Sequence, residues 1–104
     1  MTKPSAVVVD YGMGNLFSIA RVIEHLGGSA IISAEPRVVS GAERLILPGV
    51  GAFGDGVENL TRSGLDRAIR DFAAEGGPLL GICLGMQLFM TESEELGRHS
   101  GLNL

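Results

Sequence analysis

The chain has 104 residues, with 8 Lys or Arg against 12 Asp or Glu and a formal net charge of −4. This length allows one domain at most, and an acidic chain without a cluster of basic residues is not expected to bind nucleic acid. The apolar runs are far shorter than the ~20 residues that cross a bilayer, which excludes a membrane-spanning helix.

The first half of the chain alternates between strand and helix patterns. Short apolar runs predict three strands, at residues 6–9, 30–33 and 45–47. Between the first two strands, residues 15–26 place apolar side chains at helical spacing. Asn15 is suited to cap the start of this helix, and Gly27 and Gly28 are suited to the left-handed turn at its end.

The second half is expected to continue in the same way. The patterns predict a helical turn or two around Val57 and Leu60, a stronger helix with its apolar face at residues 65–73, a strand at 78–82 and a helix at 84–90. Ser63 is expected to cap the stronger helix, and Gly76-Gly77 to end it. This alternation favours an α/β fold in which a parallel sheet with right-handed crossovers carries helices on both faces.

Glycine is unusually frequent, at 16 of 104 residues against roughly 7% in an average protein. Most glycines lie close to the edges of apolar segments, where they mark loops. Three such loops follow predicted strands, at residues 10–15, at 48–55 and around Cys83. Because ligands of parallel sheets bind beyond the carboxyl ends of the strands, we expect the functional site at these loops.

The loop after the fourth strand has the form Gly-x-Cys-x-Gly, with Cys83 between Gly81 and Gly85. A nucleophile elbow needs this pattern between a strand and a helix, because a Cβ at either flanking position would collide with the tight turn. The turn also places the sulfur at a helix N-terminus, where free backbone N–H groups favour the thiolate. Cys83 is therefore the candidate nucleophile of acyl transfer through a thioester.

Backbone N–H groups near Cys83 are the candidate oxyanion donors. Leu84 directly follows the nucleophile, so its N–H is expected to point where an oxyanion would form. Segment 49–51 can bring a second N–H, because its glycines let a peptide approach a ligand or turn toward it. Such donors stabilise the negative charge that develops on the substrate's carbonyl oxygen during acyl transfer.

Each of the three loops also has a simpler interpretation. A lone cysteine in an apolar run is often only a small buried hydrophobe, although the two flanking glycines favour the nucleophile at Cys83. Segment 48–51 is as consistent with a tight turn as with a functional loop. Residues 12–14 could form a phosphate loop, but Phe17 stands where a dinucleotide fingerprint has its third glycine.

The remaining titratable residues carry weaker signals. His25 lies in the first predicted helix and His99 in a polar tail, and both are expected to be surface residues rather than bases. Glu92, Glu94 and Glu95 form a charge run that is expected to be a solvated helix end. None of these residues is expected to belong to the site.

Three segments carry a family resemblance: Asp10-Tyr11-Gly12-Met13-Gly14-Asn15-Leu16, Leu47-Pro48-Gly49-Val50-Gly51-Ala52-Phe53-Gly54-Asp55 and Gly81-Ile82-Cys83-Leu84-Gly85-Met86-Gln87-Leu88-Phe89. The third segment resembles the class I (triad) glutamine amidotransferases in general. The first two resemble, within that family, the glutaminase subunits of imidazole glycerol phosphate synthases. The resemblance covers essentially the whole chain.

The resemblance implies a flavodoxin-like parallel α/β fold and a subunit that hydrolyses L-glutamine to glutamate and ammonia. The ammonia would pass to a (βα)₈-barrel cyclase subunit, the heterodimer partner in histidine biosynthesis. No metal or organic cofactor is implied, since a thiolate, a His base and backbone donors suffice for amide hydrolysis. By similarity, the nucleophile is Cys83, the oxyanion hole is formed by Leu84, Val50 and Gly51, and glutamine is held by Gln87 and Gly49.

The chain departs from the family pattern in one respect. Members carry a catalytic His and Glu in a His-Pro-Glu-like segment far downstream of the nucleophile, whereas neither His25 nor His99 is followed by Pro-Glu. We therefore expect residues 1–104 to be the N-terminal part of a single amidotransferase domain, truncated after the elbow helix. We expect this part alone to turn over glutamine negligibly, because losing a triad base costs several orders of magnitude in rate.

Other functions remain as alternatives. Another class I amidotransferase, or a thiol hydrolase or thiol sensor, could use Cys83 on a related fold, and a flavodoxin-like module could hold phosphate or flavin in the same loops. The compartment is a separate inference. A single cysteine, together with an N-terminal apolar run too short for a signal peptide, is typical of a cytoplasmic protein.

Overall fold

The computed structural model describes residues 4–104 and contains a four-stranded parallel sheet. Its strands are β1 (Ser5–Val9), β2 (Ser29–Ser33), β3 (Leu45–Leu47) and β4 (Leu79–Gly81), in the order β2-β1-β3-β4. Leu47 of β3 lies beside Gly81 of β4, so these two strands end at the same edge of the sheet. The parallel pairing and the doubly wound order confirm the predicted sheet.

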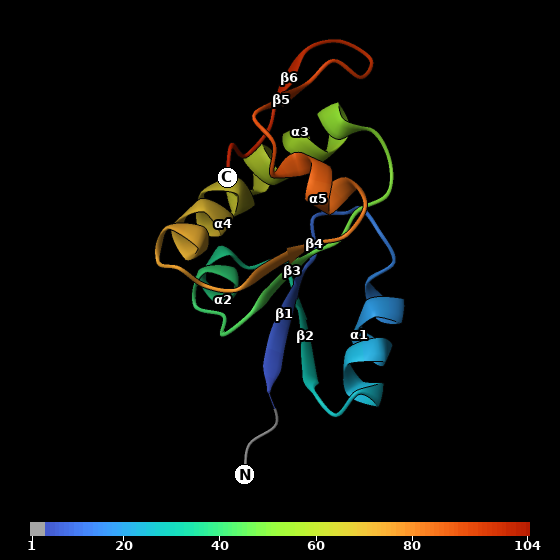
Figure 1. The fold of residues 1–104 in the computed structure, drawn as a ribbon, viewed down its shortest axis with the longest axis vertical. Helices are drawn as coiled ribbons and strands as arrows, with labels where there is room; N and C mark the ends of the chain where they lie inside the picture. The colour runs from blue at the N-terminus through green and yellow to red at the C-terminus, as the bar shows by residue number, and fades with distance from the viewer. Residues whose placement is uncertain (1–3) are drawn as a thin grey trace.

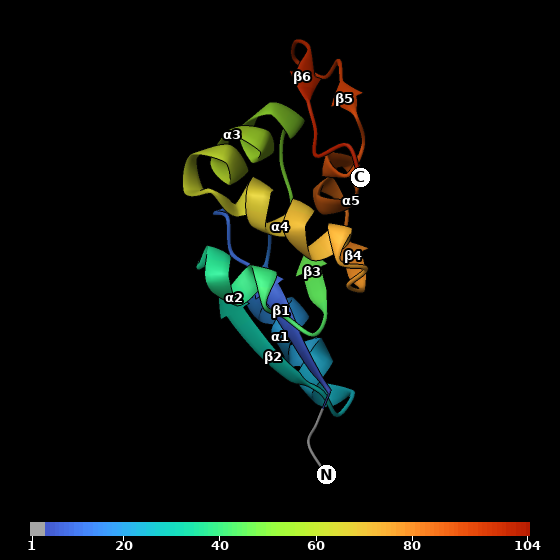
Figure 2. The same cartoon turned by 90° about the vertical axis from the view of Figure 1, so that its left-hand side faces the viewer.

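Helices cover both faces of the sheet, as the alternating pattern predicts. α1 (Leu16–His25) packs on one face, while α2 (Pro36–Ser40) and α4 (Leu65–Ala74) pack on the other (Figure 2). The side chain of Asn15 accepts from the Ser18 N–H at 3.1 Å, and Gly27 has a φ of 94°, so both predicted ends of the first helix are confirmed.

The edge where the strands end carries the remaining elements. α3 (Phe53–Ser63) and α5 (Leu84–Leu88) lie there, with the hairpin of β5 (Glu92–Ser93) and β6 (His99–Ser100) beyond them (Figure 1). Within residues 4–104, the structure has no helix long and apolar enough to cross a membrane.

The hydrophobic core lies between the sheet and the helices that pack against β3. Leu45 and Leu47 share one face of β3 because strand residues two apart point the same way, and both are fully buried. α4 covers them with its apolar stripe, which is formed by Leu65, Ala68, Ile69 and Phe72. The core therefore holds β3 firmly below the loop that begins at Pro48.

The cap of α4 differs from the prediction. Gly64, not Ser63, is the N-cap, and Ser63 is the last residue of α3. The Ser63 hydroxyl donates to the carbonyl of Asn59 at 2.8 Å. Gly64 has a φ of 77°, and this left-handed conformation turns the chain directly from α3 into α4.

Two helices extend beyond what the sequence indicates. α2 begins at Pro36, in a segment for which no helix is predicted, and proline is well tolerated in the first turn of a helix. α3 has 11 residues instead of a turn or two. The sequence pattern predicts too short a helix because Gly54 and Gly56, which have low helix propensity, interrupt it. A Cβ on Gly56 would lie 3.2 Å from the side chain of Leu88, so packing against α5 requires a small residue there.

The acidic run is not a helix end, and that prediction is wrong. α5 ends at Leu88, and the run enters the β5–β6 hairpin. Leu96 and Gly97 both have positive φ, which tightens the turn of the hairpin. Across the hairpin, the guanidinium of Arg98 pairs with the carboxylate of Glu92 at 3.0 Å.

The turn from β4 into α5 lies directly on the end of β3. The Ile82 N–H donates to the Leu47 carbonyl at 3.0 Å. A Cβ on Gly85 would overlap that carbonyl oxygen, and a Cβ on Gly81 would lie 2.6 Å from the Cα of Met86. Both glycines of the Gly-x-Cys-x-Gly pattern are therefore sterically required, as the sequence predicts.

We expect Gly85→Ala to lower the free energy of unfolding by about 3 kcal/mol, because the new Cβ meets backbone that cannot move without breaking the Ile82–Leu47 hydrogen bond. Gly27→Ala is the control: its φ is 94° but no other atom lies within 4 Å of the added Cβ, so only conformational strain of about 1 kcal/mol is expected. Urea denaturation of both variants measures the difference. Equal losses would contradict a steric requirement at Gly85.

Candidate functional site

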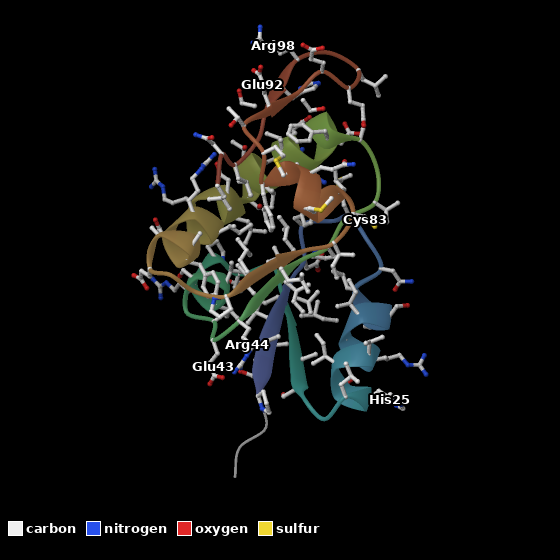
Figure 3. All side chains as sticks on the ribbon, viewed as in Figure 1. His25, Glu43, Arg44, Cys83, Glu92 and Arg98 are labelled. Carbon is white, nitrogen blue, oxygen red and sulfur yellow. The ribbon has the colours of Figure 1, made fainter. Side chains whose placement is uncertain are left out.

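Cys83 stands at the tip of the turn between β4 and α5. Its backbone has φ 53° and ψ −118°, a conformation that costs a residue with a side chain about 1–3 kcal/mol. The residue is exposed, and Figure 3 shows it at the edge of the sheet where the strands end. A strained, exposed cysteine at a strand-to-helix turn has the geometry of a nucleophile elbow.

Three loops meet at Gly49, the second residue after the end of β3. The Leu84 N–H donates to the Gly49 carbonyl at 3.2 Å, which joins the elbow to the loop after β3. A Cβ on Gly14 would lie 3.1 Å from the Gly49 nitrogen, so the loop after β1 packs there too. The structure thus brings together the three loops that the sequence analysis singled out.

The expected oxyanion donors lie in this junction, but one of them is occupied. The Leu84 N–H, expected to point at a ligand, instead binds the Gly49 carbonyl. Val50 and Gly51 are exposed beyond it, and Gly51 has a φ of 127°. A Cβ on Gly51 would lie 2.7 Å from the Cε of Met13, so this segment also touches the loop after β1.

Tyr11 is a structural member of the junction that the sequence analysis did not single out. Its side chain is buried, and its hydroxyl donates to the carbonyl of Pro48. Its own carbonyl accepts from the Asn59 Nδ2 of α3 at 3.0 Å, and Arg62 donates to the Asn59 side-chain oxygen at 2.8 Å. The available signal was a single tyrosine in the loop 10–15, two residues after a buried strand.

Gln87 lies one helical turn after Cys83 on α5, where its side chain is exposed. Beside it is an open hollow of about 310 Å³, whose lining includes Phe53, Gln87, Glu92 and Glu95. A carboxylate oxygen of Glu95 accepts from the Phe53 N–H at 3.2 Å, which fixes this side chain at the start of α3. An amide and a carboxylate in one hollow can bind a ligand that carries both a carboxylate and an ammonium group.

The sequence gives no signal that could have placed Glu95 there, because the contact between Glu95 and Phe53 joins residues 42 positions apart. A larger open hollow of about 600 Å³ lies between α3 and the hairpin, and Glu95 also lines it, together with His99. The smaller hollow is the one that contains Gln87.

The two histidines lie away from Cys83. His25 is at the end of α1, far from Cys83 in Figure 3. The His99 ring lies against Gly54 and has its Nε2 3.4 Å from the Leu96 carbonyl oxygen. Within the described residues 4–104, no group of three or more His, Cys, Asp or Glu side chains is arranged to hold a metal ion.

Comparison with protein families matches residues 7–98 to the family described as glutamine amidotransferase class-I. Two curated relatives are the imidazole glycerol phosphate synthase subunits HisH of Symbiobacterium thermophilum and Bacillus subtilis. They are 55% identical over 98 residues and 52% identical over 97 residues, and these matches cover 94% and 93% of the chain. The chain spans about half the length of these relatives, 46% of each.

Solved structures share the fold. A Listeria monocytogenes protein provisionally assigned as a peptidase E superposes with a TM-score of 0.78 at 16% identity, covering 100% of this chain and 64% of that one. A Thermoplasma acidophilum protein provisionally assigned to a GMP synthase gives a TM-score of 0.65 at 22% identity, covering 89% and 48%. At these identities the superpositions establish a common architecture.

Burial raises the pKa of Tyr11 above its ordinary value of 10.0, so the folded chain should retain the phenol proton at a pH where the unfolded chain loses it. The resulting contribution to stability is fully present below about pH 10 and falls as the pH rises further. Because Tyr11 is the only tyrosine and tryptophan is absent, phenolate absorbance reports on this residue alone. The signal should appear together with alkaline unfolding, whereas titration near pH 10 in a chain that stays folded would contradict the burial.

Proposed function

Because the chain belongs to the class I glutamine amidotransferase family, we propose that it forms part of the glutaminase subunit of an imidazole glycerol phosphate synthase. The names of its curated relatives support this choice within the family. The observation that carries the chemistry is the backbone of Cys83, held at positive φ on a strand-to-helix turn between two obligatory glycines. This geometry presents the sulfur to a ligand at the strand ends.

The proposed reaction is hydrolysis of the side-chain amide of L-glutamine. The Cys83 thiolate adds to the amide carbon, and the carbonyl oxygen becomes the oxyanion of a tetrahedral intermediate. The C–N bond then breaks, the nitrogen takes the proton that the base had accepted from the Cys83 thiol and leaves as ammonia, and a thioester remains. Water adds to the thioester, glutamate leaves, and the thiolate is restored.

The oxyanion would be held by the N–H of Leu84 and by an N–H from Val50 or Gly51. Each such donor contributes roughly 10²–10³ in rate. The Leu84 N–H can serve only if it exchanges the Gly49 carbonyl for the substrate oxygen. Because Gly49 has no Cβ and Gly51 already has positive φ, the intervening peptides can turn with little strain.

The body of the glutamine would lie in the hollow next to Gln87. The Gln87 amide can donate to the α-carboxylate, and the Glu95 carboxylate can accept from the α-ammonium. Gly49 lines the junction on the side of the elbow, where a larger residue would contact Leu84. These assignments give each charged group of the substrate a partner of opposite charge or a hydrogen-bond donor.

Residues 4–104 place no histidine beside the nucleophile to act as its base. Neither His25 nor His99 lies next to Cys83, so we propose that a group supplied from elsewhere accepts the thiol proton. The described residues alone should then turn over glutamine negligibly. The ammonia is proposed to pass to a cyclase subunit, since the relatives are named as subunits of a synthase.

Labelling of Cys83 by a diazo-ketone analogue of L-glutamine tests the proposal. In mildly alkaline buffer, in which a thiol ionises without a catalytic base, the analogue should alkylate Cys83 once, and L-glutamine at about ten times its Kd should slow this reaction roughly tenfold by competition. Mass spectrometry of a tryptic digest measures the labelled fraction over time. Cys83→Ser, which should remain unlabelled, shows that the adduct is on this sulfur.

Iodoacetamide provides the matched reagent, because it reacts with an accessible thiol without resembling the substrate. L-Glutamine should slow its reaction with Cys83 as well, because glutamine bound with its amide carbon at the sulfur covers the thiol. If L-glutamine slows neither reagent, Cys83 is a reactive thiol without a glutamine site. Rapid oxidation by peroxide together with indifference to the analogue would favour a thiol sensor instead.

A further inference from the structure

Two adjacent carbonyls in the loop after β3 are held by groups from different parts of the chain. The Pro48 carbonyl accepts from the Tyr11 hydroxyl, and the Gly49 carbonyl accepts from the Leu84 N–H at 3.2 Å. The first bond comes from the loop after β1, and the second comes from the elbow. The segment 48–51 is therefore fastened at its start independently of the nucleophile.

Tyr11 is held in place through both its side chain and its backbone carbonyl. Its ring and hydroxyl are buried, and a Cβ on Gly49 would overlap the hydroxyl oxygen. Its backbone carbonyl is bound by Asn59, whose amide is in turn oriented by Arg62. The hydroxyl thus reaches the Pro48 carbonyl from a position fixed by α3 as well as by β1.

The bond at Pro48 and the bond at Gly49 have different consequences for the proposed chemistry. The Leu84 bond must open before the Leu84 N–H can bind an oxyanion, so the peptide after Gly49 has to turn. If the start of the segment were free, the loop could move as a whole and lose its position relative to Cys83. A fixed Pro48 carbonyl confines the movement to the peptides that follow it.

We propose that Tyr11 is a positioning residue of the Cys83 site, whose hydroxyl fixes the Pro48 carbonyl so that only the peptides after it turn toward the substrate. The proposal rests on the proposed glutaminase chemistry for its consequence, but the fastening itself can be measured separately. A role in core packing alone would be met by phenylalanine, which fills the same volume without placing a hydroxyl in an apolar interior. The distinguishing group is therefore the hydroxyl.

Tyr11→Phe removes this hydroxyl and keeps the ring. Native-state amide hydrogen exchange, followed by NMR on the whole chain, should show the Leu84 amide exchanging at least tenfold faster relative to the Ile82 amide. Ile82 is the internal reference, because its N–H donates to the Leu47 carbonyl, one residue before Pro48, at 3.0 Å. An unchanged ratio of the two exchange rates would overturn the proposal.

Two further variants separate a selective effect from general destabilisation. Val39→Ala removes buried side-chain atoms on α2 without removing any of these hydrogen bonds, and should accelerate both amides equally. Asn59→Ala, at a partly buried position, removes the bond to the Tyr11 carbonyl together with the exposed bond from Arg62, and should raise the ratio by a smaller factor, about threefold. Asn59→Ala tests the proposal even if Tyr11→Phe fails to fold. An unchanged ratio of the Leu84 and Ile82 exchange rates in Asn59→Ala would overturn the proposal.

The rate at which the glutamine analogue labels Cys83 measures the consequence for the site. In Tyr11→Phe, the maximal labelling rate of Cys83 should fall several-fold while the half-saturating concentration of analogue stays the same, because the nucleophile's surroundings change and the substrate hollow does not. Iodoacetamide should label both chains at the same rate. If the analogue fails to label the unaltered chain, the proposed function is wrong, and the exchange ratio still decides whether Tyr11 fastens the loop.

Discussion

The structure depends most on the close approach of the elbow to the end of β3. The backbone from Ile82 to Gly85 lies on the carbonyl groups of Leu47 and Gly49, with hydrogen bonds of 3.0 Å and 3.2 Å and no room for a Cβ on Gly85. This contact compensates for the strained backbone of Cys83, because the turn cannot relax without breaking it. It also requires that β3 be rigid, which the buried leucines under α4 ensure.

The same contact determines whether the Leu84 N–H is free to bind a ligand. The N–H that would stabilise an oxyanion is satisfied by Gly49 and is therefore not free for a ligand. Buried donors need partners, so a pre-formed but empty oxyanion hole at Leu84 would cost about 1–3 kcal/mol. Exchange of one acceptor for another avoids this cost. On this account, substrate binding and turning of the loop are one event, and Tyr11 limits how much of the loop takes part.

Local patterns in the sequence predict the strands, α1, α4 and the elbow, because each is encoded by residues within a few positions of one another. The extent of α3 and the positions of Tyr11 and Glu95 depend on contacts between residues 37 to 48 positions apart, which no local pattern contains. Gly56 illustrates the difference: its low helix propensity argues against a helix, and its packing on α5 explains why it is there. The charge run was misread for a different reason: Leu96 and Gly97 turn the chain back into a hairpin, so that Glu92 pairs with Arg98 only six positions away.

The central claim is that Cys83 reacts with a glutamine carbonyl whose oxygen takes over the Leu84 N–H. The most direct measurement is the amide NMR spectrum of the chain after Cys83 has reacted with the diazo-ketone analogue, whose ketone oxygen stands in for the oxyanion. We expect the Leu84 amide and that of Val50 or Gly51 to shift together, while the Ile82 amide stays in place. An adduct that leaves the Leu84 and Gly49 environments as they are in the free chain would contradict it.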